Sequence, residues 1–147
     1  MARILVSACL LGVECRYKGD GCPCQRVIDL KDGNELIPVC PEQLGGLPTP
    51  RTPSERVGDK VMMRNGNDVT EEYNKGAQMA LYLARELHAD FAILKANSPS
   101  CGKGMIYDGT FTGGKCEGNG VTAELLLANG IPVYTEDEVE GISQVSS

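Results

Sequence analysis

The sequence predicts a doubly wound α/β domain, in which helices cover both faces of a mainly parallel sheet of about four strands. Short apolar runs bounded by turn residues predict the strands, at about residues 3–8, 35–39, 91–95 and 131–135. Helical periodicity fills the stretch between the second and third runs. Strands that alternate with helices are typical of parallel sheets, because a parallel connection needs a crossover about as long as a helix.

The strand predictions differ in their details. Apolar residues 4–6 lie directly before a cysteine, which indicates a buried strand that ends in a turn. Pro38 lies inside the second run, and proline cannot donate a hydrogen bond to a neighbouring strand, so this strand is expected at an edge. The Gly- and Pro-rich stretch 41–53 is too long for a simple connection, and such loops in compact domains are usually functional.

Two helices are predicted from apolar residues at three- and four-residue steps. The longer one begins near Asp68, where Asp68 and Glu71 resemble a capping box, and it runs to about His88. The shorter one covers residues 121–128. A short final helix is expected at residues 137–145. These helices complete the alternation that predicts the doubly wound sheet.

Length and composition favour a single domain over residues 1–147. The chain has 147 residues, of which 41% are hydrophobic, and this is enough for one core. Twenty acidic residues outnumber 14 basic ones, and the net charge of -6 disfavours bulk nucleic acid as a partner. No apolar run is long enough to span a membrane, and the first six residues lack the features of a signal peptide. We therefore expect a cytoplasmic protein with no membrane partner.

Seven cysteines are the most unusual feature of the composition. They lie at positions 9, 15, 22, 24, 40, 101 and 116, so five of them fall within the first 40 residues. In a reducing compartment cysteines more often bind metal or carry out chemistry than form disulfides, and an odd number weakens the disulfide interpretation further. The sequence therefore predicts metal or redox chemistry near the amino end.

Three of the cysteines follow predicted strands. Cys9 and Cys40 each come directly after a strand, and Cys101 lies six residues beyond the third. Because ligands of open parallel sheets bind outside the carboxyl ends of the strands, we expect these three thiols to meet at one sheet edge.

Two kinds of metal centre suit three converging thiolates. One is a zinc ion with an open position, and the other is a 4Fe-4S cluster with one iron not ligated by protein. Zinc sites built from cysteines usually include two cysteines close together in sequence, and no pair among Cys9, Cys40 and Cys101 has such spacing. The spacing therefore favours the cluster. A different interpretation is that these are buried structural thiols.

Four segments of the chain resemble successive motifs of one known family. SACLLGVECRYKGD begins at Ser7, PVCPEQLGGLPTPR at Pro38, KVMMRNGNDVT at Lys60 and LKANSPSCGKGMIYDG at Leu94. Together they resemble the bacterial thiouracil desulfidase family, whose members were long described only as a domain of unknown function. The resemblance covers nearly the whole chain and implies a small Rossmann-like α/β domain.

The resemblance also implies a cofactor and a set of site residues. It implies a 4Fe-4S cluster held by Cys9, Cys40 and Cys101, with a carboxylate and a serine beside the open iron. These two residues fall at Glu42 and Ser98. The iron would bind a soft thiocarbonyl sulfur and draw electron density from the adjacent carbon, so that water attacks it. Glu42 would act as the general base, and Ser98 would relay the proton or orient the water.

The expected reaction is the non-redox desulfuration of a thiolated pyrimidine such as 2-thiouracil, which yields uracil and sulfide. One alternative is a desulfidase that acts on thiolated uridine in RNA or nucleotides, although RNA would require a basic surface or an added domain. The other alternative is a non-catalytic zinc or iron-sulfur binding module. The natural substrate and the oligomeric state are left open by the sequence.

The remaining polar and sulfur residues have weaker functional interpretations. Arg51 and Ser100 are candidate substrate-binding residues, because a guanidinium recognises carbonyl or phosphate oxygens and a hydroxyl beside Cys101 can donate a hydrogen bond at the site. The alternative is structural, as an exposed loop cation and a turn cap. The other cysteines match no strong zinc pattern and are interpreted as bystanders: Cys15, Cys22, Cys24 and Cys116.

Overall fold

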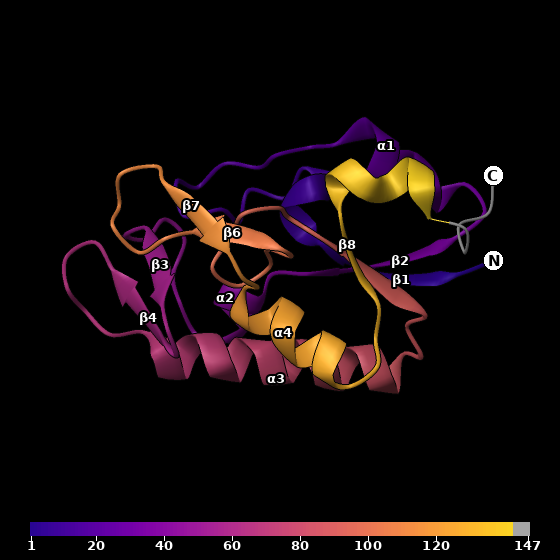
Figure 1. Cartoon of the computed structure of the whole chain (residues 1–147). Helices are drawn as coiled ribbons and strands as arrows, with labels where there is room; N and C mark the ends of the chain where they lie inside the picture. The colour runs from indigo at the N-terminus through magenta and orange to yellow at the C-terminus, as the bar shows by residue number, and fades with distance from the viewer. Residues whose placement is uncertain (143–147) are drawn as a thin grey trace.

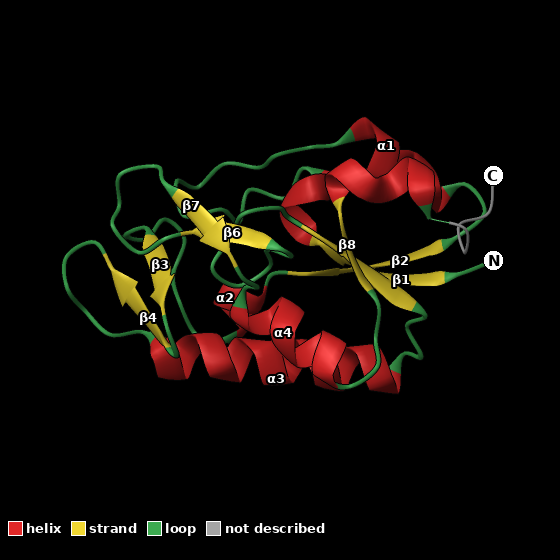
Figure 2. Ribbon diagram, viewed as in Figure 1, coloured by secondary structure: helices red, strands yellow, loops and turns green. Residues whose placement is uncertain are grey.

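A four-stranded sheet forms the centre of the molecule (Figures 1 and 2). The computed structural model describes residues 1–142. The strands are β1 (Arg3–Ser7), β2 (Glu35–Val39), β5 (Phe91–Leu94) and β8 (Val133–Thr135), and they lie in the order β2-β1-β5-β8. Each neighbouring pair is parallel. The predicted parallel sheet is therefore confirmed, and Pro38 lies in an edge strand as expected.

Alternate side chains of the strands enter two separate cores. Ile4 and Val6 of β1 pack into one core with Val27. Leu5, which lies between them, packs into the other core with Leu126. Successive side chains of a strand point to opposite faces, so a strand covered on both sides must be apolar at every position. This explains why the strands read as short continuous apolar runs.

Helices cover both faces of the sheet, as Figure 2 shows. One face carries α3 (Thr70–Glu86) and α4 (Val121–Ala128). The other carries α1 (Gln25–Ile28) and the 3-10 helices η2 (Asp29–Lys31) and η3 (Glu136–Gly141). The doubly wound α/β architecture predicted from the sequence is therefore confirmed.

The ends of two predicted helices are wrong in detail. The N-cap of α3 is Val69, which makes no side-chain cap hydrogen bond, so the predicted capping box is not formed. Instead, the amide of Thr70 donates to Asp68 Oδ1 over 2.9 Å, in a turn just before the helix. His88 lies beyond the end of α3 with φ +55°. The final helix predicted at 137–145 is the 3-10 helix η3, which ends at Gly141. Residues 143–145 of that prediction lie outside the described residues.

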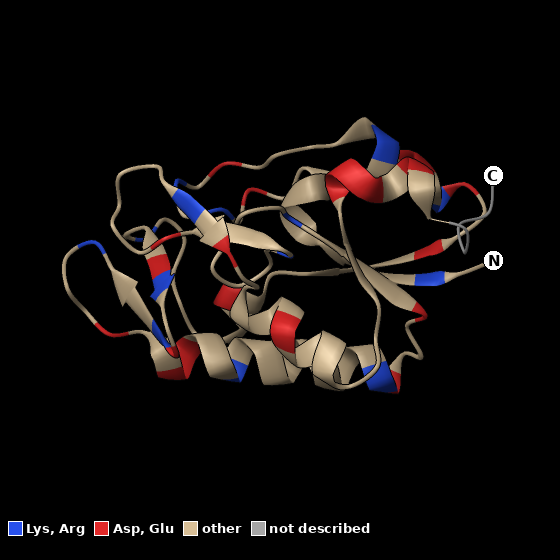
Figure 3. Ribbon diagram, viewed as in Figure 1, with Lys and Arg blue, Asp and Glu red and all other residues tan. Residues whose placement is uncertain are grey.

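The charged residues of α3 are placed favourably for its helix dipole, and η3 carries several acidic residues. Glu71 and Glu72 lie in the first turn of α3 and Arg85 in its last turn, where each sign is favoured. Figure 3 shows the acidic residues of η3 on the opposite side of the sheet. In the described part of the chain, no helix is both long enough and apolar enough to cross a membrane.

Two antiparallel hairpins were not predicted from the sequence. β3 (Ser54–Val57) pairs with β4 (Lys60–Met63), and β6 (Met105–Tyr107) pairs with β7 (Lys115–Glu117). Both lie at one end of the molecule, beyond the central sheet (Figure 1). We call residues 54–63 and 105–117 together the hairpin lobe.

Candidate functional site

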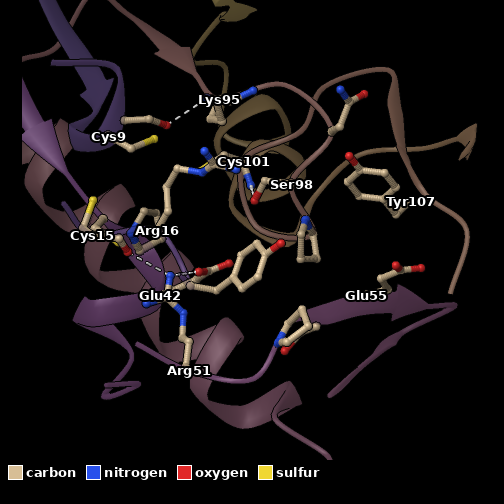
Figure 4. A pocket seen from close by; sticks show the side chains of 18 of the residues that line it. Cys9, Cys15, Arg16, Glu42, Arg51, Glu55, Lys95, Ser98, Cys101 and Tyr107 are labelled. Carbon is tan, nitrogen blue, oxygen red and sulfur yellow. Dashed lines mark hydrogen bonds and ion pairs between the residues drawn. The ribbon is translucent and has the colours of Figure 1, made fainter. Parts of the chain in front are cut away.

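A cavity of about 580 Å³ lies between the sheet and the hairpin lobe. On one side it is lined by Ser7 and Val39, the last residues of β1 and β2, and by Lys95, which directly follows β5. On the other side it is lined by Glu55 and Tyr107 of the hairpin lobe (Figure 4). Open α/β sheets bind their ligands at the carboxyl ends of their strands, which is where this cavity lies.

The three cysteines that follow strands all line this cavity. Cys9 belongs to the 3-10 helix η1 (Ala8–Leu11), which begins where β1 ends. Cys40 is the N-cap of α2 (Pro41–Leu44), and Cys101 lies in a turn after β5. Cys9 and Cys101 are buried, and Cys40 is half-buried. Three separate connections therefore bring three thiols to one space.

A fourth thiol, that of Cys15, belongs to the same group. Cys15 is buried and lines the cavity together with Cys9 and Cys40. Its backbone carbonyl also lies 3.8 Å from Cys40 Sγ. From the sequence Cys15 was interpreted as a bystander, because its spacing matches no metal motif. The turn at Gly12, with φ +98°, reverses the chain after η1 and leads it back to the site.

Cys40 and Glu42 are positioned by a backbone contact between α2 and α3. A Cβ atom added to Gly76 would lie 1.9 Å from the carbonyl oxygen of Pro41, and one added to Gly45 would lie 1.9 Å from that of Glu72. Only glycine permits such an approach. The backbone of α2 therefore rests directly on α3, which fixes both residues relative to the sheet.

The Cys101 turn is held by the side chain of Ser98. Ser98 Oγ accepts hydrogen bonds from the amides of Ser100 and Cys101, each over 3.0 Å. Ser98 itself lines the cavity. Because its oxygen already accepts two hydrogen bonds, its own hydroxyl hydrogen is left to act as a donor. Ser98 therefore orders the turn and also offers a donor to the cavity.

Both carboxylate oxygens of Glu42 have partners. The hydroxyl of Tyr73 donates to Glu42 Oε1 over 2.7 Å, and Arg51 Nη2 donates to Glu42 Oε2. Burial and the neighbouring Glu42 carboxylate raise the pKa of Tyr73, so this hydroxyl stays protonated and remains a donor. Glu42 is thereby held in one orientation at the wall of the cavity.

The two residues predicted as candidates for substrate binding, Arg51 and Ser100, already form hydrogen bonds with other groups of the protein. Arg51 has a side chain only 3% exposed, and it also donates to the carbonyls of Pro48 (3.1 Å) and Cys15 (3.0 Å). Burial opposes its charge, but the Glu42 carboxylate, together with the nearby Cys40 and Tyr73, raises the pKa of Arg51. Ser100 lies in the Cys101 turn and is buried, and its hydroxyl lies 2.8 Å from that of Thr122. Ser100 is not among the residues that line the cavity.

The lobe side of the cavity contains residues that sequence analysis missed. Glu55 is 8% exposed, and its Oε1 accepts hydrogen bonds from the amides of Gly109 (2.9 Å) and Phe111 (3.2 Å). The guanidinium of Arg64 lies 5.6 Å from the centre of the Phe111 ring. One carboxylate thus ties the two hairpins together where they enclose the cavity.

A family model described as 2-thiouracil desulfurase matches residues 4–138 of the chain. The chain belongs to this family. It is 46% identical over 149 residues to the uncharacterized protein YbbK of Bacillus subtilis (strain 168), with 95% of this chain and 99% of that protein covered. A solved structure of the 4Fe-4S-dependent thiouracil desulfidase TudS superposes with a TM-score of 0.91 at 41% identity, and it covers 98% of this chain and 97% of that one. The fold of this family member is therefore that of TudS.

The thiols of this family member suit a cluster better than a single ion. Among residues 1–142, no three side chains of His, Cys, Asp or Glu are placed to bind one metal ion. The thiols of Cys9, Cys40 and Cys101 instead surround a common cavity, so a group with several metal atoms can reach all three. Thiolate is also the ligand that iron-sulfur clusters require. The residues present therefore fit a cluster.

The thiols of Cys40 and Cys101 are protonated in the absence of metal, because the pKa of each is raised. Burial is the main cause that raises the pKa of Cys101 to about 12. The neighbouring thiol of Cys15, together with burial, raises the pKa of Cys40. Metal ligation needs thiolates, so loading must release protons at these residues.

The other cysteines lie apart from the cavity lining. The amides of Cys22 and Cys24 donate to the carbonyls of Cys9 and Leu10, each over 2.9 Å, so this segment supports η1. Cys116 is exposed on β7. These three positions stay separate from the cavity, whereas Cys15 does not.

Proposed function

We propose that this protein is a 4Fe-4S cluster-dependent desulfidase that converts a thiolated pyrimidine such as 2-thiouracil into uracil and sulfide without redox change. The main support is the meeting of three strand-end thiols with Glu42 and Ser98 in one cavity, in a chain of the 2-thiouracil desulfurase family. In this proposal Cys9, Cys40 and Cys101 hold the cluster and leave one iron without a protein ligand. Its close relative TudS is described as 4Fe-4S-dependent, which supports the choice of cofactor.

The bound cluster would supply a Lewis acid for the soft sulfur of the substrate. Glu42 takes the proton from the attacking water, because its carboxylate is held at the cavity wall by Tyr73 and Arg51. Ser98 orients this water through the hydroxyl hydrogen that its two amide contacts leave free. The carbon gains oxygen from water and loses sulfur as hydrosulfide, so no electrons are transferred.

A thiolated uridine nucleotide is a second candidate substrate. The cavity, at about 580 Å³, is in the range of pockets that hold drug-sized ligands, and it must hold the cluster as well as the substrate. Exposed Lys18 and Arg64 are among the lining residues, and such cations favour a phosphate at the rim. A comparison of turnover between a free thiolated base and its nucleotide separates the two candidates.

We also propose that the chain forms a single domain. We propose further that it works in a reducing compartment such as the cytoplasm, and this is supported by the thiols, because all seven cysteines are free. Free buried thiols are kept in this state where glutathione and thioredoxin hold the compartment reduced.

The test of the function is sulfide release from 2-thiouracil by protein reconstituted anaerobically with iron and sulfide. We expect uracil and sulfide in equal amounts, with no added reductant or oxidant. Protein loaded with zinc instead serves as the matched control and should release no sulfide. A reconstituted protein that binds a cluster and releases no sulfide from any thiolated pyrimidine would favour the non-catalytic binding module.

A further inference from the structure

The side chain of Arg16 occupies a distinctive place in the cavity. Arg16 follows Cys15 and lines the cavity together with Ser98 and Cys101. In Figure 4 its side chain extends from the Cys15 end of the site toward Cys101 and Ser98. The side chain is 31% exposed, so the guanidinium remains accessible from the cavity. It is not used in the reaction proposed above.

Within the described residues, the partners of Arg16 leave most of its hydrogen-bond donors available. Its ion pair is with Asp20, at 3.6 Å, which is long for a charge-assisted hydrogen bond. The other oxygen of this carboxylate, Asp20 Oδ1, has no hydrogen-bond partner within the described residues, so the contact is not a two-pronged fork. Arg51 differs, since its guanidinium donates to Glu42, Thr49 and two backbone carbonyls.

The backbone around Arg16 is fixed. The amide of Arg16 donates to the carbonyl of Asp20 over 3.0 Å, and the amide of Gly19 donates to the carbonyl of Arg16 over 2.8 Å. The amide of Arg51 ties the same loop down through the carbonyl of Tyr17, over 2.8 Å. A loop tied by these hydrogen bonds therefore presents a guanidinium whose donors are largely unused within residues 1–142, which is the arrangement that a ligand-binding arginine needs.

The chemistry of the substrate calls for such a donor. A thiouracil carries one sulfur and one oxo group, and only the sulfur is a soft donor suited to iron. The oxo group is a hard acceptor, and a guanidinium recognises it well. We propose that Arg16 binds the oxo group of the thiolated pyrimidine and so selects the orientation in which the sulfur faces the thiols. This inference rests on the proposed function and names the residue that binds the oxo group.

The test compares 2-thiouracil with 2,4-dithiouracil, in which a second sulfur replaces the oxo group. For Arg16→Gln with an intact cluster, KM for 2-thiouracil should rise about 10- to 100-fold while kcat changes little, because the lost contact is made equally in the ground and transition states. With 2,4-dithiouracil the same variant should lose less than about threefold, since sulfur is a weak acceptor. Equal losses with both substrates would overturn the proposal.

Two control variants separate substrate binding from loop structure. Asp20→Asn removes the ion pair of Arg16 and should leave KM unchanged or slightly lower, whereas an Asp20→Asn protein as impaired as Arg16→Gln would mean that Arg16 only holds the loop. Arg26→Gln removes an exposed arginine outside the cavity lining and should have no effect.

A uracil-binding measurement tests the role of Arg16 even if the proposed function is wrong. If the parent protein releases no sulfide, the proposed function fails, and Arg16 is then tested by titration of the cluster-loaded protein with uracil. The parent should bind uracil about 10- to 100-fold more tightly than Arg16→Gln. Equal affinities, or no binding to the parent, would overturn the inference.

Discussion

The two sides of the cavity are built in different ways. On the sheet side, the buried strands β1 and β5 and the edge strand β2 lead into η1, the Cys101 turn and α2, and these segments carry the thiols, Glu42 and Ser98. On the lobe side, Glu55 joins the two short hairpins by accepting hydrogen bonds from the amides of Gly109 and Phe111. Arg56 of the lobe also donates to the carbonyl of Asn119, just beyond β7, over 2.7 Å. The groups proposed for chemistry thus lie on the more rigid side, and the lobe shapes the space for the rest of the substrate.

This comparison predicts different signatures for substitutions on the two sides. Changes to the thiols, Glu42 or Ser98 on the sheet side should alter cluster content or kcat, whereas changes in the hairpin lobe should alter KM and spare the cluster. The following predictions test that division, beginning with the largest expected effect.

Alanine substitution of Cys40 or Cys101 should abolish cluster binding, because a thiolate ligand would be lost from a group that requires it. The measurement is iron and sulfide content after anaerobic reconstitution. Cys116→Ala removes an exposed thiol of the lobe and should load like the parent. A Cys101→Ala protein with full iron content, or a Cys116→Ala protein without iron, would contradict the assignment of the ligands.

Glu42→Gln should keep the cluster and lower kcat by about 100- to 10,000-fold, because a positioned acid-base group contributes that much to rate. Ser98→Ala should also keep the cluster and slow the reaction by no more than Glu42→Gln. Absorption of the cluster and sulfide release from 2-thiouracil are measured on the same samples. Undiminished turnover by Glu42→Gln would show that Glu42 is not the general base.

Gly76→Ala should displace α2 and with it Cys40, since the new methyl group would overlap the carbonyl of Pro41. Overpacking of this kind costs about 1 to 3 kcal/mol of unfolding free energy, partly offset by the better helix propensity of alanine. Denaturant unfolding and iron content are the readouts. Gly141→Ala is the matched control, because a Cβ there meets no atom within 4 Å. Equal stability and iron content in the two variants would mean that the contact between α2 and α3 does not position the site.

Glu55→Ala should loosen the lobe without loss of cluster. We expect KM to rise severalfold, about what one or two lost hydrogen bonds allow, and hydrogen exchange at the amides of Gly109 and Phe111 to become faster. Glu55→Gln keeps an oxygen acceptor and should restore slow exchange at both amides. Loss of iron from Glu55→Ala would contradict the prediction that changes in the hairpin lobe spare the cluster.

The sheet side could be predicted from the sequence because its physical causes are local or follow from general topology. Double burial makes each strand a short apolar run, and parallel strands bring their carboxyl ends to one edge. The positions of Cys9, Cys40 and Cys101 after three such strands therefore predicted that the thiols meet. Pro38 predicted an edge position for β2 for an equally local reason, because proline has no amide hydrogen to donate to a neighbouring strand.

The lobe and the support of Glu42 could not be predicted in the same way. Glu42 contacts Tyr73 across 31 positions of sequence, and only the packing of α2 on α3 brings the two together. Strands β6 and β7 are largely exposed and lie among glycines, so they carry no apolar alternation. One signal was available: Gly58 and Asp59 form a two-residue turn between β3 and β4, which is typical of a hairpin.

The central claim is that three thiols hold a cluster and leave one iron open to a thiocarbonyl sulfur. Mössbauer spectroscopy of the protein reconstituted with isotopically enriched iron, before and after addition of 2-thiouracil, tests it most directly. We predict that roughly a quarter of the iron signal differs from the rest and shifts when the substrate is added, while the remainder is unchanged. A spectrum that shows four equivalent thiolate-ligated sites and does not respond to 2-thiouracil would contradict this account.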